Sequence, residues 1–247
     1  MRTDEFDLIT DKLVGCTDYI YLHLMGEPLT HPDLCEFIKI ASDKGFKVAI
    51  TTNGTLLKRC SDQLLASGIY KVNVSVHSFE EGTDEEHLRY LNDCFDFVDR
   101  ASSSGILCVL RLWNRGFDEG RNLSVISLLK ERFGEDWCEA DRGARLRPKL
   151  HLEYGERFDW PSMEIDPIGD RVFCYGLGDH FGVLCDGSVV PCCLDKDGDI
   201  TLGNLFESSI SDILSSKRAE AITEGFRSKT AREELCKRCG YARRFKI

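Results

Sequence analysis

The 247-residue sequence has no apolar run that approaches the roughly 20 residues needed to cross a bilayer. Its first residues are acidic, whereas a signal peptide begins with basic residues. No low-complexity segment or internal repeat interrupts the chain. These absences predict a cytoplasmic protein with no membrane partner.

Positive charge is also scarce, because 32 lysines and arginines face 42 aspartates and glutamates and leave a net charge of -10. Broad contact with nucleic acid phosphates needs a clustered positive surface. The basic patch near the C-terminus, Lys237-Arg238 and Arg243-Arg244, is small. We therefore expect no nucleic acid partner.

Cysteine, in contrast, is abundant, with 12 residues. In a reducing compartment, clustered cysteines indicate metal binding or catalysis, and scattered cysteines indicate packing. Half of them lie singly and are predicted to be small buried hydrophobes: Cys16, Cys35, Cys60, Cys94, Cys108 and Cys138. The other half gather in the last third of the chain: Cys174, Cys185, Cys192, Cys193, Cys236 and Cys239.

The first two thirds of the chain alternate strand-like and helix-like patterns. The expected strands are 20–24, 47–52, 71–77, 106–113 and 150–154, and the expected helices are 3–14, 34–41, 56–66, 85–103 and 123–133. Repeated βα units predict an α/β fold, an incomplete parallel (βα) barrel of about five strands with a small Cys-rich C-terminal domain. We expect the barrel at 1–158, a linker at 159–172 and the Cys-rich domain at 173–247.

Polar residues follow the ends of the expected strands. Glu27 lies in Met25-Gly26-Glu27-Pro28 after the first strand, and Asn53 follows the second. Ser75 and Arg111 lie near the ends of the third and fourth. Because the carboxyl ends of parallel strands meet at the edge where α/β sheets bind ligands, we expect these four side chains to converge there.

The order strand, Met25-Gly26-Glu27-Pro28, helix, strand and Thr51-Thr52-Asn53-Gly54 resembles the core of radical S-adenosylmethionine (SAM) enzymes. In that family a Gly-Gly-Glu-Pro motif holds the amino group of the methionine moiety, and here Met25 replaces the first glycine. Side chains at the ends of the third and fourth strands contact the cofactor's carboxylate and ribose. The resemblance implies a set of cofactor-binding residues: Gly26, Glu27, Pro28, Asn53, Ser75 and Arg111. Ser75 and Arg111 match the contacts to carboxylate and ribose best, and Asn53 and Asn114 are weaker candidates. His77 either faces the substrate or is an ordinary loop side chain.

The C-terminal cysteines have the spacing of a four-thiolate site. Asp186-Gly187 between two short β-prone runs predicts a hairpin with Cys192 at its far end. Cys236-Lys237-Arg238-Cys239 lets two thiolates bind one metal centre. Two thiolates from elsewhere would complete four-fold ligation. Zinc is an alternative to iron, and Cys185 and Cys193 could substitute as ligands.

Cys174, Gly187-x4-Cys192 and Cys236-x2-Cys239 resemble the SPASM or shorter twitch extension of radical SAM enzymes. The resemblance implies one auxiliary [4Fe-4S] cluster with four ligands: Cys174, Cys192, Cys236 and Cys239. The family's first cluster is bound by Cys-x3-Cys-x2-Cys, and none of the 12 cysteines has that spacing. We expect the reading frame to continue upstream by about 30 residues, the length of a βα unit, and to encode the triplet. A second [4Fe-4S] cluster is expected only with that segment, so the chain as given should not cleave SAM.

The resemblance implies reductive cleavage of SAM and hydrogen abstraction from a peptide or small-molecule substrate, with an electron donor such as ferredoxin or flavodoxin. The alternative is a catalytically silent scaffold or binding module whose four-cysteine metal site is structural. Iron and sulfide analysis separates a cluster from zinc. SAM cleavage separates an enzyme from a scaffold.

Overall fold

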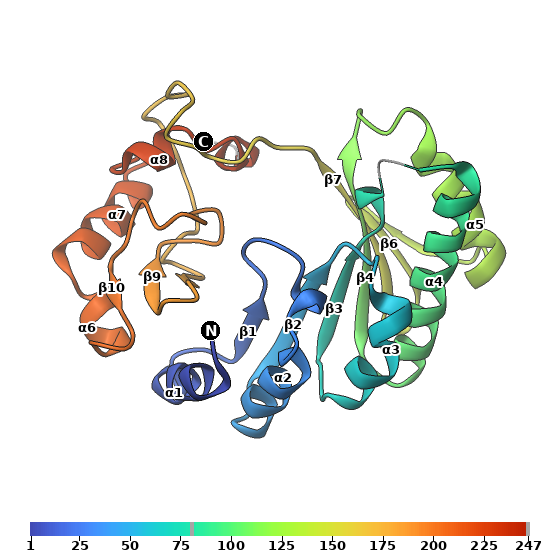
Figure 1. Cartoon of the computed structure of the whole chain (residues 1–247). Coiled ribbons are helices and arrows are strands. Elements are labelled where there is room, and N and C mark those ends of the chain that lie inside the picture. Colours follow the sequence, from blue (N-terminus) through green and yellow to red (C-terminus); the bar gives the residue numbers. More distant parts are fainter. Residues whose placement is uncertain (80–81, 246–247) are drawn as a thin grey trace. The chain divides into compact units, whose positions relative to one another are not determined.

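The computed structural model describes residues 1–79 and 82–245 (Figure 1). Residues 80, 81, 246 and 247 lie outside the description, and the last two belong to the predicted Cys-rich domain. Contacts divide the chain into two compact units. One, the sheet unit, spans residues 15–157, and the other, the cysteine unit, combines residues 1–14 with 158–247.

The sheet unit is built on a seven-stranded sheet with the order β1-β2-β3-β4-β7-β6-β5. Five neighbouring strands run parallel: β1 (Tyr19–Leu22), β2 (Lys47–Thr52), β3 (Lys71–Ser75), β4 (Leu107–Arg115) and β7 (Leu150–Glu156). They are the five strands that the sequence predicts, so the expected fold class is confirmed. The sheet does not close into a barrel among the residues described.

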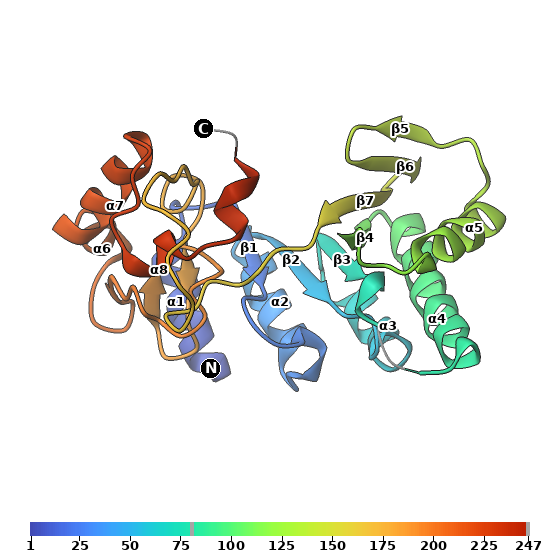
Figure 2. The same ribbon diagram turned by 90° about the horizontal axis from the view of Figure 1, so that it is seen from above.

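An antiparallel hairpin at the far end of the sheet was not expected. It consists of β5 (Cys138–Ala140) and β6 (Gly143–Arg147), and β6 pairs with β7 (Figure 2). No strand is predicted at 138–147 from the sequence, because the arginines there obscure a short alternation in which Ala144 and Leu146 are buried. Burial on one face, rather than composition, makes this segment a strand.

Four helices lie along one face of the sheet: α2 (Leu34–Asp43), α3 (Leu57–Ala66), α4 (Asp84–Ser103) and α5 (Arg121–Phe133) (Figure 1). Alternate strand residues such as Val48, Val72 and Leu110 point to this face and are fully buried. The longest helix, α4, begins with a capping box in which Thr83 and Glu86 bind each other's backbone N–H groups. The apolar core of the sheet unit lies between sheet and helices.

The opposite face of the sheet, which we call the polar face, carries the other alternate residues. Most of them are polar, charged or aromatic: Tyr19, Tyr21, Lys47, Thr51, Lys71, Asn73, Ser75, Arg111, Trp113, Arg145, His151 and Glu153. A face built only for packing would be apolar in a parallel sheet. The polar face is therefore the face of the sheet whose side chains could bind a ligand or take part in a reaction.

The cysteine unit is irregular around short elements. It contains a three-stranded sheet, β8 (Gly182–Val183), β9 (Ser188–Val190) and β10 (Gly203–Asn204), and the helices α6 (Ile210–Leu214), α7 (Lys217–Arg227) and α8 (Glu234–Lys237). The predicted turn at Asp186-Gly187 joins β8 to β9, so the hairpin is confirmed. Its core is small and apolar: Val172, Ile200, Ile222, Phe226, Ala231, Leu235 and Ala242.

The first helix, α1 (Thr3–Leu13), belongs to the cysteine unit and not to the sheet unit. The ammonium group of Lys12 donates to the carbonyls of Leu205 and Ser208, which precede α6. This grouping differs from the expected domain at 1–158, which assigned the helix to the strand that follows it in sequence. In the described residues, no helix combines the length and the apolar character needed to cross a bilayer.

Candidate functional site

The carboxylate of Glu27 organises the sheet edge after β1. Its Oε1 accepts hydrogen bonds from the hydroxyl of Thr52 at 2.6 Å and from the N–H of Leu29 at 3.1 Å. Its Oε2 accepts the N–H of Asn53 at 2.7 Å. Because an ionised carboxylate has about four acceptor positions, one position on Oε2 remains. Glu27 therefore ties the loop after β1 to the end of β2 and keeps one position for a donor on a ligand.

The turn before Glu27 presents open backbone groups. Gly26 has φ +87, a conformation that glycine adopts readily, and a Cβ atom there would meet nothing within 4 Å. Among the described residues, the carbonyl oxygens of Met25 and Gly26 accept no hydrogen bond. Pro28 begins the 3-10 turn η1 (Pro28–Thr30) that leads to α2. Free carbonyls beside a carboxylate suit an ammonium group, so this turn fits the amino group of SAM.

The second motif is held rigidly beside the first. The side-chain oxygen of Asn53 accepts the N–H and the hydroxyl of Thr55, and its backbone carbonyl accepts the hydroxyl of Tyr90 at 2.7 Å. Gly54 has φ +83, and a Cβ atom there would lie 2.7 Å from Sγ of Cys94. Asn53 therefore reaches a ligand only through its amide nitrogen, because its oxygen caps the local turn.

A threonine hydroxyl on β2 contacts three side chains, two on neighbouring strands and one in the loop after β1. Oγ1 of Thr51 lies 3.3 Å from Nδ1 of His23, 3.2 Å from Nδ2 of Asn73 and 3.4 Å from Nη1 of Arg111. His23 follows β1, whereas Asn73 and Arg111 lie on β3 and β4. Sequence reasoning missed Thr51 and Asn73 as site residues. The available signal was polarity inside two otherwise apolar strands.

Arg111 is fixed in the middle of the polar face. Its Nε lies 3.5 Å from Oε2 of Glu153, and its guanidinium group lies 4.6 Å from the ring centroid of Trp113. Ser75 pairs directly with Arg111 across β3 and β4. Of the predicted residues, Ser75 and Arg111 lie on β3 and β4, whereas Glu27 and Asn53 lie in the loops after β1 and β2. Their roles as cofactor ligands remain predictions.

His77 and Asn114, the two remaining candidates, form contacts within the protein itself. Nδ1 of His77 lies 2.9 Å from the carbonyl oxygen of Arg111 and 3.3 Å from the backbone nitrogen of Trp113. The side-chain oxygen of Asn114 accepts a hydrogen bond from Asn122 in α5 at 2.9 Å. These contacts favour the reading of His77 as an ordinary loop side chain, because one ring nitrogen is committed to β4.

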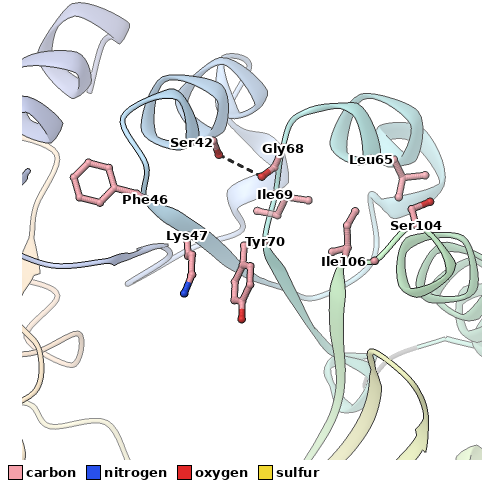
Figure 3. A pocket seen from close by; sticks show the side chains of 10 residues that line it. Ser42, Phe46, Lys47, Leu65, Gly68, Ile69, Tyr70, Ser104 and Ile106 are labelled. Carbon is pink, nitrogen blue, oxygen red and sulfur yellow. Dashed lines mark hydrogen bonds between the residues drawn. The ribbon is translucent and has the colours of Figure 1, made fainter.

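A hollow of about 420 Å³ lies at the other end of the sheet, where β2, β3 and β4 begin (Figure 3). Its lining includes Ser42, whose hydroxyl donates to the carbonyl of Gly68 at 3.3 Å, and the side chains of Lys47 and Tyr70. Parallel α/β sheets bind ligands at the carboxyl ends of their strands. The hollow lies at the opposite ends and shares no residue with the predicted cofactor site.

The four predicted metal ligands lie in one neighbourhood of the cysteine unit. Cys174, Cys236 and Cys239 pack against the apolar core of that unit. Cys192 follows β9, and its pKa is raised first by burial and then by its cysteine neighbours, Cys174 and Cys239 among them. A hairpin end and a Cys-x-x-Cys turn that are distant in sequence therefore lie near each other, and their role as metal ligands stays a prediction.

Burial disfavours the thiolate form of these four cysteines. It raises the pKa of all four, and that of Cys192 to about 12. Peptide N–H groups oppose this effect at the sulfurs, as when the N–H of Gly176 donates to Sγ of Cys174 at 3.4 Å. Backbone N–H groups also lower the pKa of Cys239. Hydrogen bonds to cysteine sulfurs are a feature of iron–sulfur sites, so these residues fit a cluster.

The thiols are neighbours without forming a closed set of ligands. Among the described residues, no three His, Cys, Asp or Glu side chains are arranged to hold a single metal ion. Of the two substitute ligands, Cys193 is half-buried and interacts with Cys174, whereas Cys185 is exposed in the turn of the hairpin. Cys193 is therefore the only one of the two substitutes shown to interact with the cysteine neighbourhood.

Comparison with protein families identifies the two parts of the chain. The radical SAM superfamily matches residues 3–132, and SPASM, an iron-sulfur cluster-binding domain, matches residues 174–240. The first match covers 130 of the 247 residues, which is more than half. The chain belongs to the radical SAM superfamily and carries a C-terminal SPASM domain. These families imply SAM and [4Fe-4S] clusters as its cofactors.

Individual relatives share a limited part of their sequence with this chain. A probable GTP 3',8-cyclase of Sulfolobus acidocaldarius is 25% identical over 263 aligned residues, which cover 90% of this chain and 77% of the relative. An AdoMet-dependent heme synthase of Methanosarcina barkeri is 35% identical over 77 residues, covering 31% of this chain and 22% of the relative. AdoMet is another abbreviation of SAM. The relatives indicate an enzyme family.

Solved structures share the fold. BtrN in an open conformation aligns with a TM-score of 0.56 and 18% identity over 97% of this chain and 79% of that one. The structure of anSMEcpe with bound AdoMet aligns with a TM-score of 0.57 and 13% identity over 98% of this chain and 78% of that one. The parallel-rich sheet is thus the fold of radical SAM structures.

Proposed function

We propose that this protein binds SAM at the carboxyl edge of its parallel sheet and acts as a radical SAM enzyme on a small organic molecule. The observation that carries the proposal is the carboxylate of Glu27, which is anchored by three hydrogen bonds and keeps one acceptor position. It lies beside the open carbonyls of Met25 and Gly26, which suit an ammonium group.

In this proposal, each residue binds or orients the cofactor. Glu27 and the carbonyls of Met25 and Gly26 hold the amino group of SAM. Ser75 and Arg111, on adjacent strands, face its carboxylate and ribose. When bound beside a reduced cluster, SAM supplies a means of hydrogen abstraction. The protein's contribution is to fix the position of the cofactor relative to the polar face, since a loosely held reactant loses rate.

The reductive step is conditional. The 12 cysteines of the given sequence contain no Cys-x3-Cys-x2-Cys. We therefore propose SAM binding for these 247 residues and make its reductive cleavage conditional on a second four-iron cluster, reduced by a donor such as ferredoxin or flavodoxin. The auxiliary cluster at Cys174, Cys192, Cys236 and Cys239 would bind the substrate or take up an electron from it.

The names of the relatives favour a small substrate over a peptide. Those reported above are named for GTP and for heme, which are both small molecules. The second candidate function, a silent scaffold with a structural four-cysteine site, is favoured by the absence of the cysteine triplet from the given sequence. A cytoplasmic location agrees with reduced cysteines and an oxygen-sensitive cluster.

SAM binding is tested by isothermal titration calorimetry, in which SAM is added to the anaerobically purified chain. Glu27→Gln replaces a carboxylate oxygen by an amide nitrogen, which cannot accept from Thr52 or Asn53. We expect SAM affinity to fall by roughly tenfold to a hundredfold, the worth of a charge-assisted hydrogen bond. Glu36→Gln, an exposed change on α2, should leave it unchanged.

A second ligand separates direct contact from collapse of the loop. 5'-Methylthioadenosine lacks the amino group of SAM, so Glu27→Gln should weaken its binding far less than that of SAM. Equal losses for both ligands would mean that Glu27 only supports the loop. A chain that binds neither ligand, with its helical content intact, would contradict the proposed function and favour the scaffold.

A further inference from the structure

Positive charge gathers on the polar face, although the chain as a whole carries a net charge of -10. Lys71 lies on β3, Arg111 on β4 and Arg145 on β6, with His151 on β7 between the last two. Arg145 pairs directly with His151 across β6 and β7, which places both side chains on one face. We call these four residues the basic cluster.

An acidic residue of β7 lies beside the basic cluster. Glu153 lies 3.5 Å from Nε of Arg111, so one positive charge has an ion-pair partner. Within residues 1–79 and 82–245, neither Lys71 nor Arg145 forms an ion pair. Three cations against one carboxylate leave two positive charges when His151 is neutral. Within the described residues, no ion pair offsets the charges of Lys71 and Arg145.

Lys71 is the most unusual member of the cluster. It is half-buried on the polar face, and burial together with the charge of Arg111 lowers its pKa. Burial and the charges of Arg145 and Lys71 likewise lower the pKa of His151. Lysine is seldom buried without a partner, because burial penalises its charged form. An anion placed among these groups would remove that penalty.

An unsatisfied acceptor lies beside the cluster. Asn73, two residues after Lys71 on the same face of β3, is fully buried. Its Nδ2 donates to the carbonyl of Ile50 and to Thr51, whereas its Oδ1 has no partner among the described residues. Buried polar atoms are rarely left unpaired, so this atom calls for a donor from a ligand. A hydroxyl or amine on the bound molecule would satisfy it.

We propose that the basic cluster binds the phosphate group of a small hydroxyl- or amine-bearing substrate, with Lys71 and Arg145 as its main contacts. A phosphate monoester carries about two negative charges at neutral pH, which matches the excess of two positive charges. Glu153 keeps Arg111 oriented, and Asn73 accepts from the hydroxyl or amine of the substrate. The inference rests on the proposed function only in calling this molecule a substrate.

The test measures inorganic phosphate binding to the full chain by calorimetry at low ionic strength. Lys71→Met and Arg145→Gln should each weaken phosphate binding about tenfold or more, since each removes a charge-assisted contact. Arg142→Gln is the matched control, because Arg142 is exposed in the same hairpin and should leave affinity unchanged. Glu153→Gln should strengthen binding by removing the opposing charge.

Further controls test whether the bound ion is phosphate and whether the variants remain folded. Lys71→Arg, which keeps the charge, should retain phosphate binding, and thermal melting should show that the variants remain folded. Unchanged affinity in both Lys71→Met and Arg145→Gln would overturn the inference. Acetate binding as tightly as phosphate would overturn the assignment to phosphate. Phosphate binding without SAM binding would support the phosphate site at the basic cluster and contradict only the proposed function. SAM binding without phosphate binding would support the proposed function and contradict the phosphate site.

Discussion

Replacing Cys192 or Cys239 by alanine should remove the iron–sulfur cluster from anaerobically purified protein. Mutation of a residue that only supports a metal ligand typically lowers metal affinity by roughly tenfold to a hundredfold. Loss of a direct ligand should therefore lower the affinity at least as much. Iron and sulfide content per chain, together with the visible absorbance of the cluster, measures the effect. We expect about one four-iron cluster in the unchanged chain and at least a tenfold loss in each variant.

Two further variants serve as controls. Cys185→Ala removes an exposed thiol from the same hairpin and should leave the iron content unchanged. Cys193→Ala tests the thiol that lies beside Cys174 and follows Cys192 in sequence. Loss of iron in Cys193→Ala but not in Cys192→Ala would move the ligand assignment to Cys193. One zinc per chain without iron would contradict the cluster altogether.

Loss of the cluster should also loosen the cysteine unit. Its apolar core is small, and three of the four ligand cysteines pack against it. Metal binding contributes folding free energy where a core alone is insufficient. Hydrogen exchange of α7 and α8 should therefore be faster in Cys192→Ala than in Cys185→Ala.

Gly54→Ala should destabilise the sheet unit by about 3 kcal/mol, the sum of a left-handed backbone strain and an overpacked core. Gly54 has φ +83, and an added Cβ atom would lie 2.7 Å from Sγ of Cys94 and 3.2 Å from the ring of Tyr90. The neighbours cannot move freely, since Cys94 is fully buried and Tyr90 holds the carbonyl of Asn53. Urea unfolding followed by tryptophan fluorescence measures the loss.

Gly45→Ala separates the two causes. Gly45 has φ +92, and a Cβ atom there meets nothing within 4 Å, so only the backbone strain of about 1–2 kcal/mol applies. In a Cys94→Ala background, Gly54→Ala should cost less than in the unchanged chain, because the blocking sulfur is gone while the ring of Tyr90 remains 3.2 Å away. Equal costs for Gly54→Ala and Gly45→Ala in the unchanged chain would show that the close approach to Cys94 is irrelevant.

The five parallel strands could be predicted because the residues of each strand form a recognisable local pattern. In β2 and β3, valine and isoleucine alternate with residues of the polar face, and turns bound both strands. The hairpin of β5 and β6 could not be predicted in this way. Its register depends on pairing with β7, and Gly143 is needed there because a Cβ atom would lie 2.0 Å from the carbonyl of Leu152.

The candidate site was likewise predictable only in part. Met25-Gly26-Glu27-Pro28 and Asn53-Gly54 are local motifs, so their positions at strand ends follow from the order of elements. That the carboxylate of Glu27 would accept from Thr52 and Asn53 could not be predicted, since these hydrogen bonds join residues about 25 positions apart. The side-chain oxygen of Asn53 turned out to cap its own turn.

The sequence by itself determined the family, the parallel βα order and the candidate thiolates, because motifs, periodicity and cysteine spacing are local properties of a chain. Only the tertiary structure decided which distant groups meet. It placed α1 with the cysteine unit, brought His23, Asn73 and Arg111 to the hydroxyl of Thr51, and gathered Lys71, Arg111 and Arg145 on one face. The physical reason is that strand register and helix docking depend on burial summed over many residues, and a one-residue change of register would turn every one of these side chains to the other face.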